Sequence, residues 1–174
     1  AYAACIVDGT SYNVGGTGLT SSTAAGGAIT LSIIKNDWDT TDDDISTCDV
    51  STIRDMTSMF ADNSDFNQNI STWNTSNVTN MSVMFSGATD FNQNIGSWDV
   101  SKVTNMEFMF RSASAFNQNI GSWEVEAVTN LRFILNGTAL STPNYDALVI
   151  GWDALELQNN LFFFSAGVTK YSAG

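Results

Sequence analysis

Hydrophobic and polar residues alternate through the middle of this chain in a pattern that returns every 25 residues. The segment Trp-Asp-Val-Ser-Lys-Val-Thr-Asn-Met, which starts at Trp98, has equivalents that start at Cys48, Trp73 and Trp123. A second segment, Phe-Asn-Gln-Asn-Ile, keeps the same interval from Phe66 onward. A repeat of this length is typical of a solenoid, in which each repeat buries its apolar face against its neighbours.

Aligning the repeats predicts which positions point inward, because a solenoid builds its core from columns of one side chain per coil. The predicted inward columns are Ile45/Ile70/Ile95/Ile120, Cys48/Trp73/Trp98/Trp123, Ile53/Val78/Val103/Val128, Met56/Met81/Met106/Leu131, Met59/Met84/Met109/Ile134, Phe60/Phe85/Phe110/Leu135 and Phe66/Phe91/Phe116. The positions between these columns are mostly polar and are expected on the surface.

Within one repeat the spacing changes from strand-like to helix-like. Trp98 and Val100 alternate with polar residues, which predicts a short parallel strand. From Val103 to Phe110 the apolar residues fall at i, i+3, i+6 and i+7, which predicts one or two helical turns. Thr104 and Glu107 have the spacing of a capping box, and Gly87 in the preceding repeat is a candidate helix stop. The expected fold is an α/β solenoid, leucine-rich-repeat-like, with about four coils of short parallel strand plus short helix.

The ends of the chain depart from the repeat and are expected to be caps that close the core of the solenoid. We divide the single domain into an N-terminal cap (1–44), the repeats (45–144) and a C-terminal cap (145–174). Residues 29–38 form a short amphipathic helix or a strand. Pro143 and Asn144 precede an N-capped helix over 145–152. The apolar residues 161–164 are expected to form a buried strand.

The repeat resembles that of the BspA-like leucine-rich repeat surface proteins, which reads close to Phe-Asn-Gln-x-Ile-x-x-Trp-x-Val-Ser-x-Val-Thr-x-Met-x-x-Met-Phe. Residues 95–110 match it throughout, and residues 70–85 match it except that Thr75 replaces a Val. This resemblance implies a secreted or surface-displayed solenoid that takes part in adhesion and in protein or glycan contacts, without a family catalytic site. Cys48, Glu126 and the set Leu131, Ile134 and Leu135 depart from the pattern in the first or last repeat, as expected beside caps.

Composition narrows the function further. The net charge is −12, from 18 acidic and 6 basic residues, which disfavours binding to nucleic acids and anionic membranes. No apolar stretch is long enough to cross a bilayer. The chain opens on Ala1-Tyr2 like a processed or excised fragment, so any export signal is expected to be removed or absent. Cys5 and Cys48 are either one disulfide, which we favour, or two inert thiols.

The residue types in the chain favour a non-enzymatic protein. The chain has no His, which removes the commonest general base and metal ligand. Asp99 and Glu124 lie one coil apart and are the best candidate pair for a retaining glycosidase, but a solvated polar face is the stronger interpretation. No cofactor is expected, although the acidic segment could bind calcium through some of the carboxylates of Asp37, Asp39, Asp42, Asp43 and Asp44.

We therefore expect an extracellular or cell-surface, non-catalytic recognition module for adhesion, which binds a protein or a glycan. The predicted ligand face consists of Ser71, Thr72, Asn74, Gly96, Ser97, Asp99, Gly121, Ser122 and Glu124. The alternative is a structural subunit that assembles with copies of itself into a surface layer or fibre. Ice or mineral binding ranks lower because the outward columns do not repeat Thr. The ladder of Asn67, Asn92 and Asn117 is expected to satisfy backbone groups at turns rather than to bind a ligand.

Overall fold

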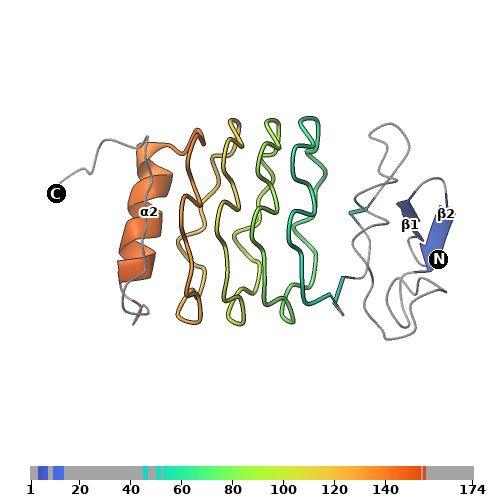
Figure 1. Cartoon of the computed structure of the whole chain (residues 1–174), viewed down its shortest axis with the longest axis horizontal. Helices are drawn as coiled ribbons and strands as arrows, with labels where there is room; N and C mark the ends of the chain where they lie inside the picture. Colours follow the sequence, from blue (N-terminus) through green and yellow to red (C-terminus); the bar gives the residue numbers. More distant parts are fainter. Residues whose placement is uncertain are drawn as a thin grey trace.

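The computed structural model describes residues 4–7, 10–13, 45–46, 50–51, 53–153 and 155. Strands β1 (Ala4–Val7) and β2 (Thr10–Asn13) pair in an antiparallel hairpin, with Cys5 opposite Tyr12. Helix α2 spans Thr142–Asp153. Between residues 53 and 141 the chain winds into coils that stack side by side along the long axis, and α2 lies against the last of them (Figure 1). The elements predicted over 29–38 and 161–164 lie outside the described residues.

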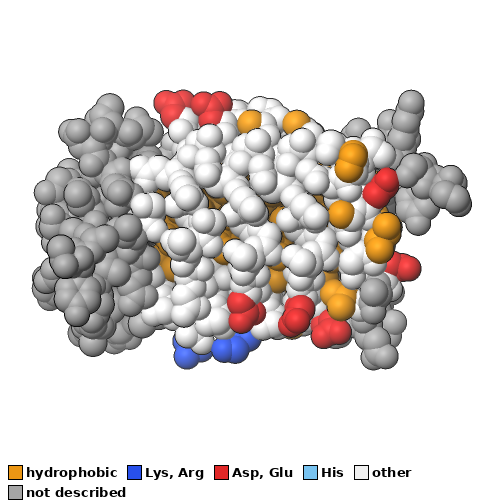
Figure 2. Space-filling model, turned by 180° about the vertical axis from the view of Figure 1, so that it is seen from behind, with side chains coloured by type: hydrophobic (Ala, Val, Ile, Leu, Met, Phe, Trp, Pro, Cys, Tyr) orange, Lys and Arg blue, Asp and Glu red, His pale blue; other side chains and the backbone are white. Residues whose placement is uncertain are grey.

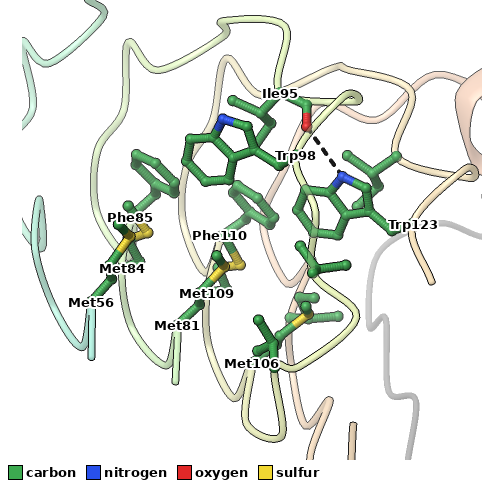
Figure 3. Close-up of a cluster of buried hydrophobic side chains, with 14 of the residues drawn as sticks. Met56, Met81, Met84, Phe85, Ile95, Trp98, Met106, Met109, Phe110 and Trp123 are labelled. Carbon is green, nitrogen blue, oxygen red and sulfur yellow. Dashed lines mark hydrogen bonds between the residues drawn. The ribbon is translucent and has the colours of Figure 1, made fainter. Parts of the chain in front are cut away.

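The predicted inward columns are confirmed at every position that the structure describes. All of these side chains are at most 4% exposed. Figure 3 shows how the Met, Phe and Trp columns of successive coils lie one behind another. The rings of Phe85 and Phe110 stack with centroids 5.6 Å apart, and those of Trp73 and Trp98 with centroids 6.4 Å apart. The core is thus a set of parallel stacks that run through the coils.

Each indole in the Trp column also makes a hydrogen bond to the preceding coil. Trp73 Nε1 donates to the backbone oxygen of Ile45 at 3.0 Å, and Trp98 Nε1 donates to that of Ile70 at 3.1 Å. Trp123 Nε1 repeats the bond to the oxygen of Ile95 at 3.1 Å, as drawn in Figure 3. Because a buried carbonyl without a partner is costly, these bonds fix the register of each coil on its neighbour.

The prediction of a short strand and a short helix in each coil is wrong. Residues 95–98 and 100–103 each close a tight turn, with Trp98 N–H bonded to Ile95 at 3.1 Å and Val103 N–H bonded to Val100 at 2.9 Å. Residues 103–110 are also turns. The coils touch through isolated parallel bridges in the column Asp55, Asn80, Asn105 and Asn130 rather than through continuous strands. Across residues 53–141 the described backbone contains neither a helix nor a ladder of strands.

Two backbone features replace the expected helical turns. The N–H groups of Met106 and Phe108 donate to backbone oxygens of the following coil at 2.9 Å each, whereas Met109 N–H bonds back to Met106 at 3.2 Å. Phe108, the third residue of this last turn, has φ +57°, a value that no α-helix contains. Thr104 Oγ1 donates to the backbone of Thr79 at 3.1 Å, so the predicted capping box does not form. Gly87 is left-handed, with φ +75°, but it ends no helix.

Helix α2 begins three residues before the predicted start. The N–H of Tyr145 donates to the backbone oxygen of Ser141 at 2.9 Å, which closes the first turn. Pro143 is therefore inside the helix rather than upstream of it. Proline is tolerated there because first-turn N–H groups have no acceptor within a helix. The side chain of Asn144 bonds to Asn117 and not to the end of its own helix.

Helix α2 takes the place of one more coil. Trp152 Nε1 donates to the backbone oxygen of Ile120 at 3.2 Å, which continues the bonds of the Trp column. Asn144 Nδ2 donates to the backbone oxygen of Asn117 at 2.8 Å, as Gln118 Nε2 does to that of Asn92 one coil earlier. The helix thus satisfies the same groups that a further repeat would satisfy.

Two glycines permit this close contact. A Cβ atom at Gly151 would overlap the backbone oxygen of Gly121, and a Cβ atom at Gly121 would overlap that of Ala147. The backbone of α2 therefore lies directly on the backbone of the last coil. Leu148 and Trp152 are the buried side chains of the helix.

Candidate ligand-binding face

The residues of the predicted ligand face lie on the outside of the coils, but on turns instead of strands. Thr72, Asn74, Ser97, Asp99, Ser122 and Glu124 are exposed, and Ser71, Gly96 and Gly121 are partly buried. The turns alternate inward and outward residues, because the buried Trp98 and Val100 flank the exposed Asp99. The outward position of these residues is thus as predicted, although the backbone conformation differs.

One column of this face is a row of hydroxyl groups held by the neighbouring coil. Thr72 Oγ1 donates to the backbone oxygen of Ser46 at 3.2 Å. Ser97 Oγ and Ser122 Oγ donate to the preceding coil at 3.4 and 3.0 Å. Since each hydroxyl proton is used inside the protein, the oxygen lone pairs remain as acceptors toward solvent.

The second column carries amide and carboxylate oxygens held by local turns. Asp99 Oδ1 accepts hydrogen bonds from Ser101 Oγ at 2.7 Å and from Ser101 N at 3.0 Å. These two bonds, with a smaller contribution from the charge of Lys102, hold the pKa of Asp99 below its ordinary value. Asn74 makes the equivalent turn one coil earlier, with Ser76 N at 3.2 Å. Asp99 is therefore an ionised acceptor in a fixed orientation.

The two columns border a shallow hollow of about 280 Å³. It is lined by residues 96–101 of one coil together with Ser122 and Glu124 of the next coil. The hollow brings together five of the predicted face residues, namely Gly96, Ser97, Asp99, Ser122 and Glu124. At Gly96 an added Cβ atom would come within 2.7 Å of the backbone oxygen of Asn119, so the two coils lie close together beside the hollow. Ser101 also lines the hollow and was missed by the sequence analysis, because its position is polar in every repeat.

The chemistry of this hollow is that of an acceptor-rich surface. Two carboxylates and the lone pairs of bound hydroxyls face solvent, so the face suits a ligand that is rich in hydrogen-bond donors. Figure 2 shows one face of the molecule, on which uncharged polar side chains and backbone cover most of the coils and charged side chains lie toward the edges. A fixed array of this kind can bind without chemical conversion of its ligand.

The Asn and Gln ladders have the structural role predicted for them. Asn92 N donates to Asn67 Oδ1 at 3.0 Å, and Gln93 Nε2 bonds to Asn67 O and Oδ1 at 2.9 Å each. Asn92 repeats this arrangement with the next coil. These side chains join neighbouring coils, and the amide oxygens of Asn67 and Asn92 are engaged within the protein.

Other predicted sites fall where the structure gives no description. The calcium site at Asp37, Asp39, Asp42, Asp43 and Asp44 lies outside the described residues, and so does Cys48 of the predicted disulfide with Cys5. Among the described residues, no cluster of three or more Asp, Glu or Cys side chains could hold a metal ion. In the same part of the chain, no helix has the length and apolar character needed to cross a membrane.

The sequence analysis also missed a second group of exposed side chains. Phe108 and Phe133 occupy an outward column, and Arg111 and Arg132 lie on their rings. The signal was present in the sequence, since the first two repeats carry Ser58 and Val83 in this column. A change from small to aromatic residues in an outward column therefore indicates a surface site.

The protein is a tandem-repeat, solenoid-like protein. Its coils are built from turns, recur every 25 residues and bury stacks of Trp and Phe side chains. Residues 30–147 match the family described as "Mycoplasma protein of unknown function, DUF285". The chain belongs to this family, whose match extends over most of its length. No curated protein and no solved structure matches the chain.

Proposed function

We propose that this chain is a non-catalytic recognition module of a secreted or cell-surface protein, and that it binds a protein or a glycan through the predicted ligand face. The hollow between Asp99 and Glu124 is the observation that carries the proposal. Its acceptors complement the hydroxyl groups of a sugar or the ammonium and guanidinium groups of a basic protein segment. The resemblance of the repeat to BspA-like leucine-rich repeat surface proteins supports the location and the adhesive role.

The open surroundings of Asp99 favour binding over catalysis. A retaining glycosidase needs one protonated carboxyl group as general acid beside an ionised nucleophile. The bonds from Ser101 to Asp99 favour its ionised form, which opposes a role as proton donor but suits a nucleophile, so the acid–base state alone does not decide between the two functions. Glu124 lies on the same open surface, which is exposed rather than walled as a glycosidase cleft is. Open, preorganised acceptors are suited to reversible contacts.

The experiment compares two single variants on glycan and protein arrays. Ser122→Leu fills the hollow and removes one bond to the preceding coil. Ser114→Leu is the matched control, because Ser114 is also exposed and its Oγ donates to the backbone of Thr89 at 3.3 Å. Ligands of the hollow bind the wild type and Ser114→Leu and bind Ser122→Leu at least about tenfold more weakly. Array ligands that bind both variants equally would show that the hollow is not the binding site.

The alternative, self-assembly into a layer or fibre, has one observation in its favour. Ile150 on α2 is 72% exposed and is the large hydrophobic side chain that stands out on the described surface. Sedimentation at increasing concentration, with and without calcium, compares the wild type with Ile150→Asp. Polymers that grow with concentration and disappear in Ile150→Asp would favour assembly, whereas a monomer at all concentrations contradicts it.

A further inference from the structure

The outward column Ser58, Val83, Phe108 and Phe133 has an unusual backbone conformation. All four residues have positive φ, between +54° and +61°. This region is costly for side chains that are bulky or branched at Cβ, and glycine or asparagine is the ordinary choice. The turn imposes the conformation on every coil, but it does not demand a large side chain, because Ser58 suffices. Phe at the last two positions thus requires another explanation.

The two phenylalanines form a small aromatic surface outside the core. Their rings stack with centroids 5.5 Å apart and an interplanar angle of 7°. Both are partly exposed and belong to none of the core columns. Arg111 Cζ lies 5.6 Å from the centroid of Phe108, and Arg132 Cζ lies 5.0 Å from that of Phe133. We call these four side chains the aromatic–arginine patch.

The guanidinium groups of the patch keep most of their donors available. Arg132 approaches Glu107 at 3.8 Å, which is too long for a hydrogen bond. The other carboxylate oxygen of Glu107 accepts from Asn130 Nδ2 at 3.1 Å. Among the described residues, Arg111 has no carboxylate partner. Each arginine is exposed and is held over a ring by a cation–π contact.

The charge of the patch contrasts with the rest of the chain. The protein carries 18 acidic and 6 basic residues, yet here two arginines lie over two rings that stack on each other. The patch also lies on the opposite wall of the coils from the hollow. The ring of Phe85 meets that of Trp98 at 6.2 Å, so the segments that contain these two residues face each other across the core. Phe108 lies two residues before Phe110, which is the counterpart of Phe85 in the next coil, whereas the hollow is built around the segment of Trp98.

We propose that the aromatic–arginine patch binds a protein segment in which an Asp or Glu carboxylate stands beside an apolar side chain. Guanidinium groups recognise carboxylates through paired hydrogen bonds, and Phe surfaces bury apolar groups. Aromatic and arginine side chains are the ones that dominate protein interfaces. Nucleic acids and anionic membranes are disfavoured because of the charge of −12. This site is independent of the ligand face described above.

The test uses the full chain and a phage-displayed library of random dodecapeptides. Two double variants remove the patch: Phe108→Val with Phe133→Val, which copies Val83 of the same column, and Arg111→Gln with Arg132→Gln. The control is Arg54→Gln with Lys102→Gln, which removes the same charge elsewhere. We expect selected peptides to carry Asp or Glu next to an apolar residue. Their affinity falls at least about tenfold in both patch variants and is unchanged in the control.

Three results would overturn the proposal. Selected peptides without an acidic bias would refute the carboxylate preference. Peptides that bind the Phe variant as well as the wild type, together with a lower Tm of that variant, would assign the rings to stability alone. A dimer in sedimentation that the patch variants dissociate would make a second copy of this chain the occupant. Failure of the Ser122→Leu experiment affects none of these readouts, because the two sites lie on opposite walls.

Discussion

A repeat coil and helix α2 both pack against the preceding coil, but they do so with different backbone conformations. The coil at residues 95–119 uses consecutive turns, and α2 is a regular helix of 12 residues. Both nevertheless place an indole N–H on a carbonyl of the preceding coil, through Trp98 and Trp152, and a side-chain amide on an Asn of that coil. The end of a solenoid is therefore closed when its exposed backbone groups are hydrogen-bonded, whichever backbone conformation supplies the bonding partners.

The largest expected effect comes from removing the indole in each element. Trp98→Ala should lower the free energy of unfolding by about 3–5 kcal/mol, because a cavity opens between two coils and the carbonyl of Ile70 loses its partner. Trp152→Ala should cost about half as much, since within the described part of the chain α2 packs on a single coil. Chemical denaturation followed by circular dichroism measures both. An equal or larger loss in Trp152→Ala would mean that the helix organises the whole stack.

The contact between Gly151 and Gly121 gives the next effect. Alanine normally stabilises a helix relative to glycine by about 1 kcal/mol. At Gly151 the added Cβ overlaps the backbone of Gly121, so we expect Gly151→Ala to destabilise the protein by about 1–3 kcal/mol. Ile150→Ala, on the exposed side of the same helix, is the control and should change stability by less than about 0.5 kcal/mol. A stabilised Gly151→Ala variant would contradict the close packing.

The hydrogen bonds accepted by Asn92 and Asn117 test whether α2 is held to the last coil as strongly as one coil is held to the next. Asn92→Ala removes the acceptor of Asn117 N and Gln118 Nε2, and Asn117→Ala removes that of Ser141 N and Asn144 Nδ2. Each loss should cost about 1–2 kcal/mol. Thermal unfolding of the two variants should therefore agree. A clearly smaller effect at Asn117 would show that α2 does not depend on these bonds.

The smallest effect concerns a turn that α2 does not copy. Asp153 follows Trp152 as Asp99 follows Trp98, but the position that corresponds to Ser101 holds Leu155, which has no hydroxyl group and whose N–H donates to the backbone oxygen of Trp152 at 3.2 Å. Because the pKa of Asp99 is lowered in the folded state, its contribution to stability is present above the unfolded pKa of about 3.9 and is lost as the pH falls through the folded pKa.

Ser101→Ala should raise the pKa of Asp99 toward its ordinary value, as measured by NMR titration of the carboxyl carbon. Its effect on stability at neutral pH should stay below about 0.5 kcal/mol, because the carboxylate is exposed and screened by solvent. Ser76→Ala serves as the control, since its partner Asn74 does not titrate. An unchanged pKa of Asp99 in Ser101→Ala would mean that the hydroxyl bond does not lower it.

The core and the outward face could be predicted from the sequence because they depend only on which positions recur. Trp98 and Val100 point inward and Asp99 outward in any conformation that alternates sides. The recurrence of positions could not distinguish the helix predicted over 103–110 from the turns that the structure has there. Successive three-residue turns also bring Val103, Met106 and Met109 to one side, so the same spacing fits both structures.

Residue type does not predict most of the residues with positive φ. Glycine appears at Gly87 and Gly137, but Ser58, Val83, Phe108 and Phe133 adopt positive φ without it. The hydrogen bonds between coils impose this conformation, and they exist only once the neighbouring coil is in place. The hollow likewise depends on how two coils meet, whereas its lining residues could be named in advance.

The parallel indoles of Trp73 and Trp98 also make the fold a source of its own optical signal. Their planes differ by 2° and their ring centroids are 6.4 Å apart, so the excited states of the two chromophores couple. Emission from one can be depolarised by transfer to the other, and their transitions can split in near-ultraviolet circular dichroism. Both signatures vanish when adjacent coils separate, which allows the stack to be followed spectroscopically without any added label.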